Sequence, residues 1–91
     1  MGEEIEAVAR GRVQGVMYRD FVRRAAGKFG VCGFMENAPD GTVRVVAQGT
    51  PDALKALVER LYRGSVLARV ESVAVLWRTP ERRYEEFSIR Y

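Results

Sequence analysis

The sequence predicts an α+β fold in which two helices cover one face of an antiparallel sheet. Segments of alternating apolar and polar residues, typical of strands, are interleaved with two segments whose apolar residues recur at helical spacing. Each helical segment has a single apolar stripe, so both helices should bury that stripe against the same sheet. With 91 residues, 47% of them hydrophobic, the chain is long enough for one such domain over residues 1–91.

The first segments predict a strand, a tight turn and a helix. Residues 5–13 alternate between apolar and polar positions, which indicates a half-buried strand. The following stretch, 14–17, is short and turn-like. Apolar residues at helical spacing then predict a helix from Tyr18 to Phe29, and Gly30 is suited to end it.

A hairpin and a second helix are expected next. Residues 31–36 and 42–48 are predicted strands joined by a proline-aspartate-glycine turn at 39–41, because proline fixes φ and glycine accepts a positive φ. Thr50 can then cap a helix whose first residue is Pro51. The apolar stripe of this helix and the glycine that ends it are Leu54, Leu57, Val58, Leu61, Tyr62 and Gly64.

The last part of the chain predicts two more strands. Residues 70–77 are rich in valine, but the spacing between Val70 and Val73 requires a bulge or an irregular start. A polar loop over 79–86 separates this strand from a short one at 87–91. The resulting order, β-α-β-β-α-β plus a short strand, is that of the ferredoxin-like fold.

Missing residue types exclude several kinds of chemistry. The chain has no histidine, which rules out a histidine general base and the usual serine or cysteine triads. Because Cys32 is the only cysteine, we expect no metal site and no internal disulfide. No apolar run approaches the roughly 20 residues of a membrane span, and the acidic residues 1–4 are unlike a secretory signal. We therefore expect a cytoplasmic protein that does not enter membranes.

The net charge of +3 is unevenly distributed along the chain. Residues 10–28 contain six basic side chains and only Asp20 as an acid, so this stretch has a charge of +5. A local positive field favours an anionic partner such as a phosphate ester, a nucleic acid or a membrane surface. The alternative interpretation is a solvated helix face that has no partner.

The stretch from Gly11 to Arg19 (GRVQGVMYR) joins the first strand to the start of the first helix. The first N–H groups of a helix lack partners within it, and the helix dipole adds partial positive charge there. Such a turn can present several N–H groups to one anion, and Arg19 could fork onto the same phosphate. A nucleotide-binding P-loop would need a Lys-Ser/Thr pair, which is absent. The alternative is an ordinary turn with Arg19 on the surface.

Asn37 is the only asparagine and precedes the hairpin turn. It could hold a water molecule or polarise an oxygen, or it could simply bond the backbone of the turn. Neither the first nor the third strand has the aromatic residues typical of RNA-binding ferredoxin-like domains, which argues against nucleic acid as a partner. The aromatic residues expected in the core or at its edge are Phe29, Tyr62, Trp77, Phe87 and Tyr91.

Several segments together resemble the acylphosphatase family. They are Gly11–Arg19, 33–37 (GFMEN), 40–43 (DGTV), 68–70 (ARV) and 87–91 (FSIRY). The resemblance extends over nearly the whole chain. It implies a ferredoxin-like fold and hydrolysis of the carboxyl-phosphate bond of acyl phosphates to a carboxylate and inorganic phosphate, without a metal or another cofactor.

The resemblance also implies roles for individual residues. Arg19 matches the family's phosphate-binding arginine, and Asn37 matches its water-orienting asparagine. The residues that match the phosphate-binding loop are Gln14, Gly15, Val16, Met17 and Tyr18. The sequence departs from the family pattern at Tyr18, where phenylalanine is usual, at Met35, where valine is usual, and at Ser65-Val66, where a proline pair is common.

We expect a free-standing, monomeric acylphosphatase, and three alternatives remain beside it. One is an acylphosphatase-like domain of the kind found in the large carbamoyltransferase that matures hydrogenases, against which the two ends of the chain argue. Another is a ferredoxin-like module that binds nucleic acid through the basic residues of 10–28. The third is a module that binds phosphate, or serves regulation, without catalysis. For the enzyme, the partner is a small-molecule acyl phosphate, and inorganic phosphate is both product and inhibitor.

Overall fold

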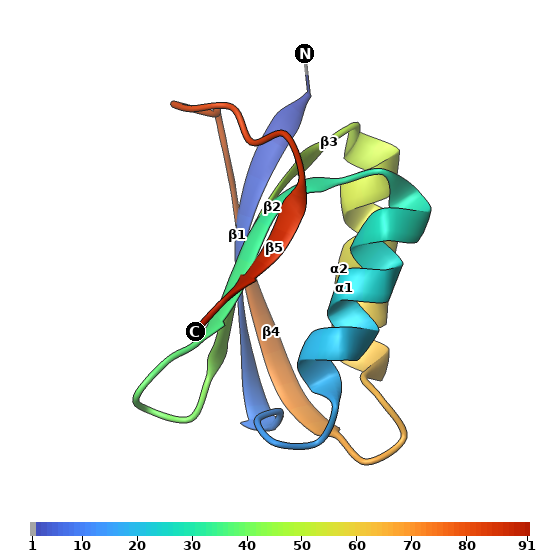
Figure 1. Ribbon diagram of the computed structural model, residues 1–91, viewed down its shortest axis with the longest axis vertical. Coiled ribbons are helices and arrows are strands. Elements are labelled where there is room, and N and C mark those ends of the chain that lie inside the picture. Colours follow the sequence, from blue (N-terminus) through green and yellow to red (C-terminus); the bar gives the residue numbers. More distant parts are fainter. Residues whose placement is uncertain (1) are drawn as a thin grey trace.

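A computed structural model describes residues 2–91 and has the predicted order of elements. The five strands form one sheet in the order β4-β1-β3-β2-β5, and both helices lie on one face of it (Figure 1). The α+β, ferredoxin-like prediction is confirmed. Among residues 2–91, no helix has the length and apolar character needed to cross a membrane. The elements are β1 (Glu3–Arg12), α1 (Tyr18–Phe29), β2 (Cys32–Asn37), β3 (Val43–Gly49), α2 (Pro51–Arg63), β4 (Arg69–Arg78) and β5 (Phe87–Arg90).

The sheet is mixed rather than fully antiparallel. β5 runs parallel to β2, with Gly33 paired with Phe87 and Met35 paired with Ile89, while the other neighbouring strands are antiparallel. The loop over 79–86 crosses from β4 at one edge of the sheet to the opposite edge, and the chain then enters β5 in the direction of β2 (Figure 1). The expectation of an antiparallel sheet is therefore corrected for its last strand.

The end of α1 and the start of α2 lie where the sequence predicts, because the capping signals are local. Gly30 has a φ of 69°, and its N–H group donates to the carbonyl oxygens of Ala26 and Gly27 at the end of α1. The hydroxyl oxygen of Thr50, which precedes α2, accepts a hydrogen bond from the N–H group of Ala53 at 3.2 Å. Each signal acts within about one helical turn and is therefore visible in the sequence.

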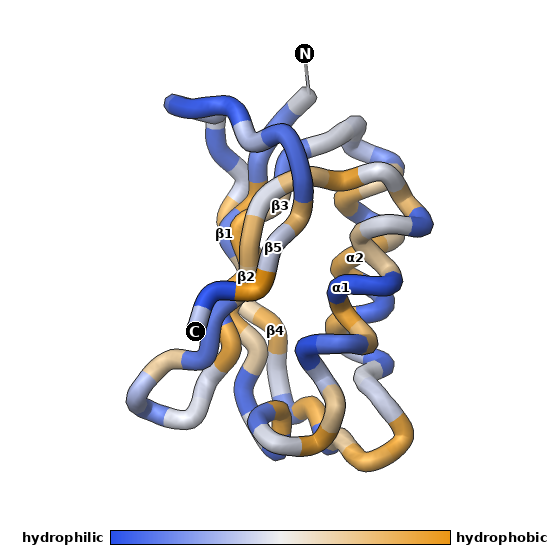
Figure 2. The backbone as a smooth tube through the Cα atoms, viewed as in Figure 1, coloured by the Kyte–Doolittle hydropathy of each residue, from blue (hydrophilic) through white to orange (hydrophobic). Residues whose placement is uncertain are grey.

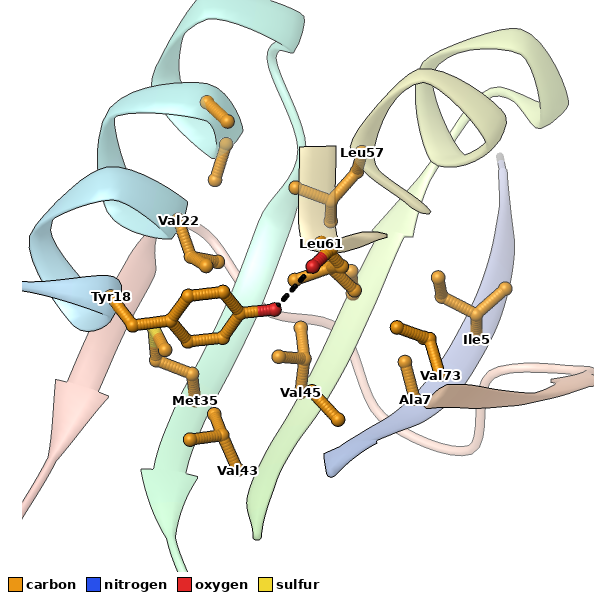
Figure 3. Close-up of a cluster of buried hydrophobic side chains, with 14 of the residues drawn as sticks. Ile5, Ala7, Tyr18, Val22, Met35, Val43, Val45, Leu57, Leu61 and Val73 are labelled. Atoms are coloured by element: carbon orange, nitrogen blue, oxygen red, sulfur yellow. Dashed lines mark hydrogen bonds between the residues drawn. The ribbon is translucent and has the colours of Figure 1, made fainter. Parts of the chain in front are cut away.

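The hydrophobic core lies between the helices and the sheet. Tyr18 is part of this core, and its hydroxyl group donates a hydrogen bond of 2.7 Å to the carbonyl oxygen of Leu61 in α2 (Figure 3). Apolar residues recur along the helices and strands, whereas the loop over 79–86 is mostly hydrophilic (Figure 2). Other fully buried side chains of the cluster in Figure 3 are Ile5, Val22, Met35, Val43, Val45, Leu57 and Leu61.

β4 has the irregularity that the spacing of its valines predicts. Arg10 of β1 pairs with Ser72, but Gly11 pairs with Val70, so Glu71 is an extra residue in β4. At Gly11, a Cβ atom would lie 2.2 Å from a carbonyl oxygen of β4, so the bulge requires glycine there. The bulge lies at the end of β1 that leads toward α1.

Only part of the predicted aromatic set packs against the core. Phe29 and Phe87 do so, whereas Tyr62, Trp77 and Tyr91 have exposed fractions of 53%, 39% and 99%. Trp77 lies on the edge strand β4, and Tyr91 follows the other edge strand, β5. Tyr62 belongs to the apolar stripe predicted for α2 but is more than half exposed, and its hydroxyl group donates to the carbonyl oxygen of Val73 in β4 at 3.0 Å.

The sheet face opposite the helices has a network of ion pairs. Arg78 pairs with Glu4 and Glu6, and Arg44 pairs with Glu6 and, at 3.9 Å, with Glu36. The hydrogen bond from Arg44 is the main cause that lowers the pKa of Glu6. Arg44 and Arg78 are thus balanced by carboxylates on a face remote from the helices.

Candidate active site

The loop between β1 and α1 presents uncommitted backbone donors. Gly15 and Met17 have left-handed backbone conformations, with φ of 70° and 63°. Within residues 2–91, the N–H groups of residues 15–20 donate to no other group of the protein. Backbone N–H groups at a helix start, arranged around left-handed residues, form a concave site suited to an anion.

Two side chains from distant parts of the sequence hold this loop. The amide Nε2 of Gln14 donates to the carbonyl oxygens of Ala38 and Thr42, both at 2.9 Å, which ties the loop to the β2–β3 turn. The hydroxyl group of Ser65 donates to the carbonyl oxygen of Val16 at 2.7 Å, which ties the loop to the α2–β4 connection. All three segments lie at the same end of the molecule (Figure 1). Both side-chain N–H groups of Gln14 are used in this way, so its backbone N–H group is the donor left for an anion.

Arg19 lies in the first turn of α1 and pairs with no acidic side chain of the described residues. The carboxylate of its neighbour Asp20 pairs with Arg23 and Arg24, both at 3.0 Å. Among residues 2–91, no carboxylate forms a salt bridge with Arg19. Its guanidinium carbon instead lies 4.9 Å from the centre of the Tyr91 ring. The guanidinium group is therefore held against an aromatic face while its N–H donors remain available.

A hollow of ≈ 350 Å³ lies where these groups meet. A larger hollow of ≈ 530 Å³ lies near the loop over 79–86, at the other end of the molecule, beside the free thiol of Cys32. We place the candidate site in the smaller hollow, because free backbone donors and an unpaired guanidinium group converge there. Its lining residues are Gly15, Met17, Tyr18, Arg19, Asp20, Arg23, Ile89 and Tyr91.

Asn37 lies at the same end of the sheet, although it does not line the hollow. It is the last residue of β2, is exposed, and follows Met35 on the face that the helices cover. Met35 pairs with Ile89 of β5, and continuing this parallel register by two residues brings Tyr91 opposite Asn37. Tyr91, against whose ring Arg19 lies, is therefore the expected β5 neighbour of Asn37.

The hairpin turn does not depend on the side chain of Asn37. The N–H group of Ala38 donates to the carbonyl oxygen of Thr42 at 2.8 Å, and the Asp40 carboxylate accepts bonds from the Thr42 hydroxyl and N–H groups at 2.6 and 3.0 Å. The hydroxyl bond is the main cause that lowers the pKa of Asp40. Within the described chain, the Asn37 side chain takes part in no hydrogen bond, so its amide is free to bind a ligand or water.

Sequence reasoning missed some residues of this end of the molecule. Tyr91 and Ile89 line the hollow, although the sequence indicates only a short last strand for both and a core or edge position for Tyr91. Ser65 stands out in the sequence as a departure from the proline pair, but nothing in the sequence links it to Val16. Tyr18 is also a departure, and its hydroxyl group points into the core rather than into the hollow.

Comparison with known proteins assigns the chain to a family. Residues 5–89 match the family model described as Acylphosphatase. The chain belongs to the acylphosphatase family. It is 42% identical to the acylphosphatase of Salinibacter ruber over 88 residues, which cover 97% of this chain and 93% of that protein.

Solved structures agree with this assignment. The crystal structure of the acylphosphatase from Bacillus subtilis superimposes with a TM-score of 0.95 at 34% identity and covers 98% of this chain and 99% of that chain. A TM-score of 0.90 relates the chain to 12% of full-length HypF at 22% identity, so the same fold also occurs within a larger protein. The chain is an acylphosphatase, a hydrolase that cleaves the carboxyl-phosphate bond of acyl phosphates, and not a binding module without catalysis.

Proposed function

We propose that Arg19 and the backbone N–H groups of residues 14–18 bind the phosphoryl group of the acyl phosphate. The observation that carries this proposal is the unpaired guanidinium group of Arg19 beside loop donors that have no partner in residues 2–91. The positive end of the α1 dipole adds to the attraction for a phosphate. The guanidinium group can also form two parallel bonds to phosphoryl oxygens, which fixes the orientation of the group.

We propose that Asn37 orients the water molecule that attacks phosphorus. Its amide offers both a donor and an acceptor, is exposed, and is not used by the turn that follows it. Asn37 ends β2 at the same end of the molecule as the loop, which supports a place for its water beside the bound phosphoryl group. The water oxygen bonds to phosphorus as the bond between phosphorus and the acyl oxygen breaks. The products are a carboxylate and inorganic phosphate.

The chemistry of an acyl phosphate explains why this chain needs no histidine. The carboxylate is a good leaving group, so little protonation is required to expel it. We propose that the proton of the attacking water passes to a phosphoryl oxygen of the substrate. Catalysis then consists mainly of positioning the water and stabilising charge on the phosphoryl oxygens. In this proposal, the reaction uses no metal and no cofactor.

We also propose that residues 1–91 act as one domain, as a monomer and in the cytoplasm. All five strands of the described chain share one sheet and one core, which supports a single unit. A free cysteine is typical of proteins in reducing compartments, which supports the cytoplasm. Size-exclusion chromatography with light scattering would test the monomer, and a dimer mass would contradict it.

Variants of Arg19 and Asn37 test the proposed roles separately. Arg19→Ala should abolish hydrolysis of benzoyl phosphate and weaken binding of inorganic phosphate, and Arg19→Lys should restore little, because an ammonium group cannot form the forked pair. Asn37→Ala should leave phosphate affinity nearly unchanged while kcat falls by about 10²–10³-fold. Lys28→Ala is a matched control, because it removes a positive charge from the other end of α1.

Calorimetric phosphate binding, kcat and the thermal midpoint should be measured for every variant. If Asn37→Ala keeps most of its turnover, Asn37 does not orient the water. If Asn37→Ala lowers the thermal midpoint and leaves kcat near normal, the residue serves the turn instead. Retention of phosphate affinity in Arg19→Ala would show that the phosphate binds elsewhere.

A further inference from the structure

Met17 is a strained residue, and the peptide groups on both sides of it are each held by a hydrogen bond. Met17 is the only non-glycine residue among residues 2–91 with a positive φ, and its angles of 63° and 18° are left-handed. A residue with a Cβ atom keeps this conformation only when its surroundings hold it there. Ser65 donates to the Val16 carbonyl oxygen before Met17, and the Phe21 N–H group donates to the Met17 carbonyl oxygen at 3.1 Å after it.

The bond from Ser65 also determines where a loop donor points. In a trans peptide, the carbonyl and N–H groups point in opposite directions within one plane. Because no cis peptide is present in the described chain, the Ser65 bond that directs the Val16 carbonyl oxygen also directs the N–H group of Met17 the other way. Met17 lines the hollow, and its N–H group is one of the uncommitted donors.

Ser65 is itself well anchored. The preceding Gly64 ends α2 and donates its N–H group to the Arg60 carbonyl oxygen at 2.9 Å, and the Ala68 N–H group donates to the Ser65 carbonyl oxygen at 3.0 Å. The serine hydroxyl therefore reaches the loop from a rigid connection. A proline at this position could not donate such a bond.

We propose that Ser65 is a positioning residue of the active site, which keeps Met17 in the left-handed conformation and aims the loop N–H groups at the phosphoryl group. The proposal rests on the phosphate-binding role proposed above for this loop. It predicts that the hydroxyl group of Ser65 acts on substrate and phosphate affinity, through Met17, and not only on stability.

The first experiment compares Ser65→Ala and Ser65→Thr. Ser65→Ala should weaken phosphate binding by about two- to tenfold, which is the range expected for loss of one neutral hydrogen bond. KM for benzoyl phosphate should rise by a similar factor. Ser65→Thr keeps the hydroxyl group and should bind phosphate nearly as wild type does. Thr50→Ala is the matched control, because it removes a hydroxyl cap at the other end of α2 and should lower the thermal midpoint without weakening phosphate binding.

The second experiment tests the route through Met17 by a double-mutant cycle. Glycine adopts the left-handed conformation without strain, so in the Met17→Gly background Ser65→Ala should weaken phosphate binding by less than about twofold. A loss as large as in the wild-type background would overturn the role of Ser65 in holding Met17. The proposal as a whole would be overturned if Ser65→Ala bound phosphate as tightly as the wild type does. It would also be overturned if Ser65→Thr bound phosphate as weakly as Ser65→Ala does.

Arg19→Ala separates this inference from the function on which it rests. If Arg19→Ala loses phosphate affinity and Ser65→Ala does not, only the role of Ser65 is refuted. If Arg19→Ala keeps phosphate affinity, the loop is not the phosphate site, and both proposals fail.

Discussion

Replacing Tyr18 by phenylalanine tests how α1 and α2 are joined beneath the active site. Tyr18 has an exposed fraction of 1%, and its hydroxyl group donates to the Leu61 carbonyl oxygen at 2.7 Å. That carbonyl lies in the last turn of α2, where carbonyl groups have no partner within the helix. Tyr18→Phe keeps the packed ring and removes only the oxygen, so the buried carbonyl group loses its bond without a large cavity being formed.

The expected cost follows from that geometry. Loss of a neutral hydrogen bond costs about 0.5–1.5 kcal/mol, and leaving a buried acceptor unsatisfied raises this to about 1–3 kcal/mol. We therefore expect the free energy of unfolding to fall by about 1–2 kcal/mol in Tyr18→Phe. For a domain of this size, the thermal midpoint should fall by roughly 5–10 °C. kcat/KM for benzoyl phosphate should stay unchanged, because the hydroxyl group points away from the hollow.

The difference in unfolding free energy between the wild type and Tyr18→Phe should depend on pH, and this dependence identifies the hydroxyl group as its cause. Burial raises the pKa of Tyr18 above its ordinary value of 10.0. A group with a raised pKa contributes stability that is fully present below pH 10.0 and is lost as the pH rises further, because the unfolded chain then releases the proton first. The difference in unfolding free energy between the wild type and Tyr18→Phe should thus be constant near neutral pH and shrink above pH 10.0.

Urea denaturation at a series of pH values measures this difference. Other titrating groups are the same in both proteins and cancel. An unchanged thermal midpoint in Tyr18→Phe, or a difference that grows above pH 10.0, would refute the reasoning.

Four further expectations concern the anion site, metals and two glycines of the backbone. Inorganic phosphate should inhibit competitively with benzoyl phosphate, because both offer the same oxygens to Arg19 and the loop; inhibition of kcat alone would contradict this. Activity should survive treatment with EDTA, since residues 2–91 contain no cluster of three or more His, Cys, Asp or Glu side chains that could hold a metal, and rescue by a divalent ion would reveal one. Gly33→Ala should lower the unfolding free energy by more than about 4 kcal/mol, as its Cβ atom would lie 1.9 Å from the Val46 carbonyl oxygen. Gly27→Ala, in open space on α1, should raise it by about 0.5–1 kcal/mol, and urea denaturation checks both.

The fold could be predicted where the signals are local and missed where they are not. Gly30 and the pair Thr50-Pro51 mark helix ends through bonds within one turn, and the bulge follows from the spacing of nearby valines. The direction of β5 depends on the path of the loop over 79–86 across the sheet, which no local pattern encodes. The exposure of Tyr62 is also missed, because its helical spacing matches a buried stripe. Its hydroxyl group donates a hydrogen bond to β4, which is not indicated by local spacing.

The candidate site, like the fold, could be predicted from the sequence only where its signals are local. Arg19 and the loop lie in one continuous motif, and Asn37 precedes a recognisable turn, so the sequence identifies them as candidates. The side chains that hold the loop come from far along the chain: Gln14 bonds residues 24 and 28 positions away, and Ser65 bonds a residue 49 positions away. Their roles depend on the complete fold, which brings the three connections to one end of the molecule.

The charge of the site depends on pairing rather than on the number of basic residues. Asp20 lines the hollow and would repel a phosphate, but its two oxygens are tied to Arg23 and Arg24. These exposed pairs contribute little to stability, yet they balance the only acid in the basic stretch. Arg19 and the N-terminus of α1 are then left to set the sign of the field in the hollow. The uneven charge of the sequence thus acts at the site chiefly through one guanidinium group without a carboxylate partner.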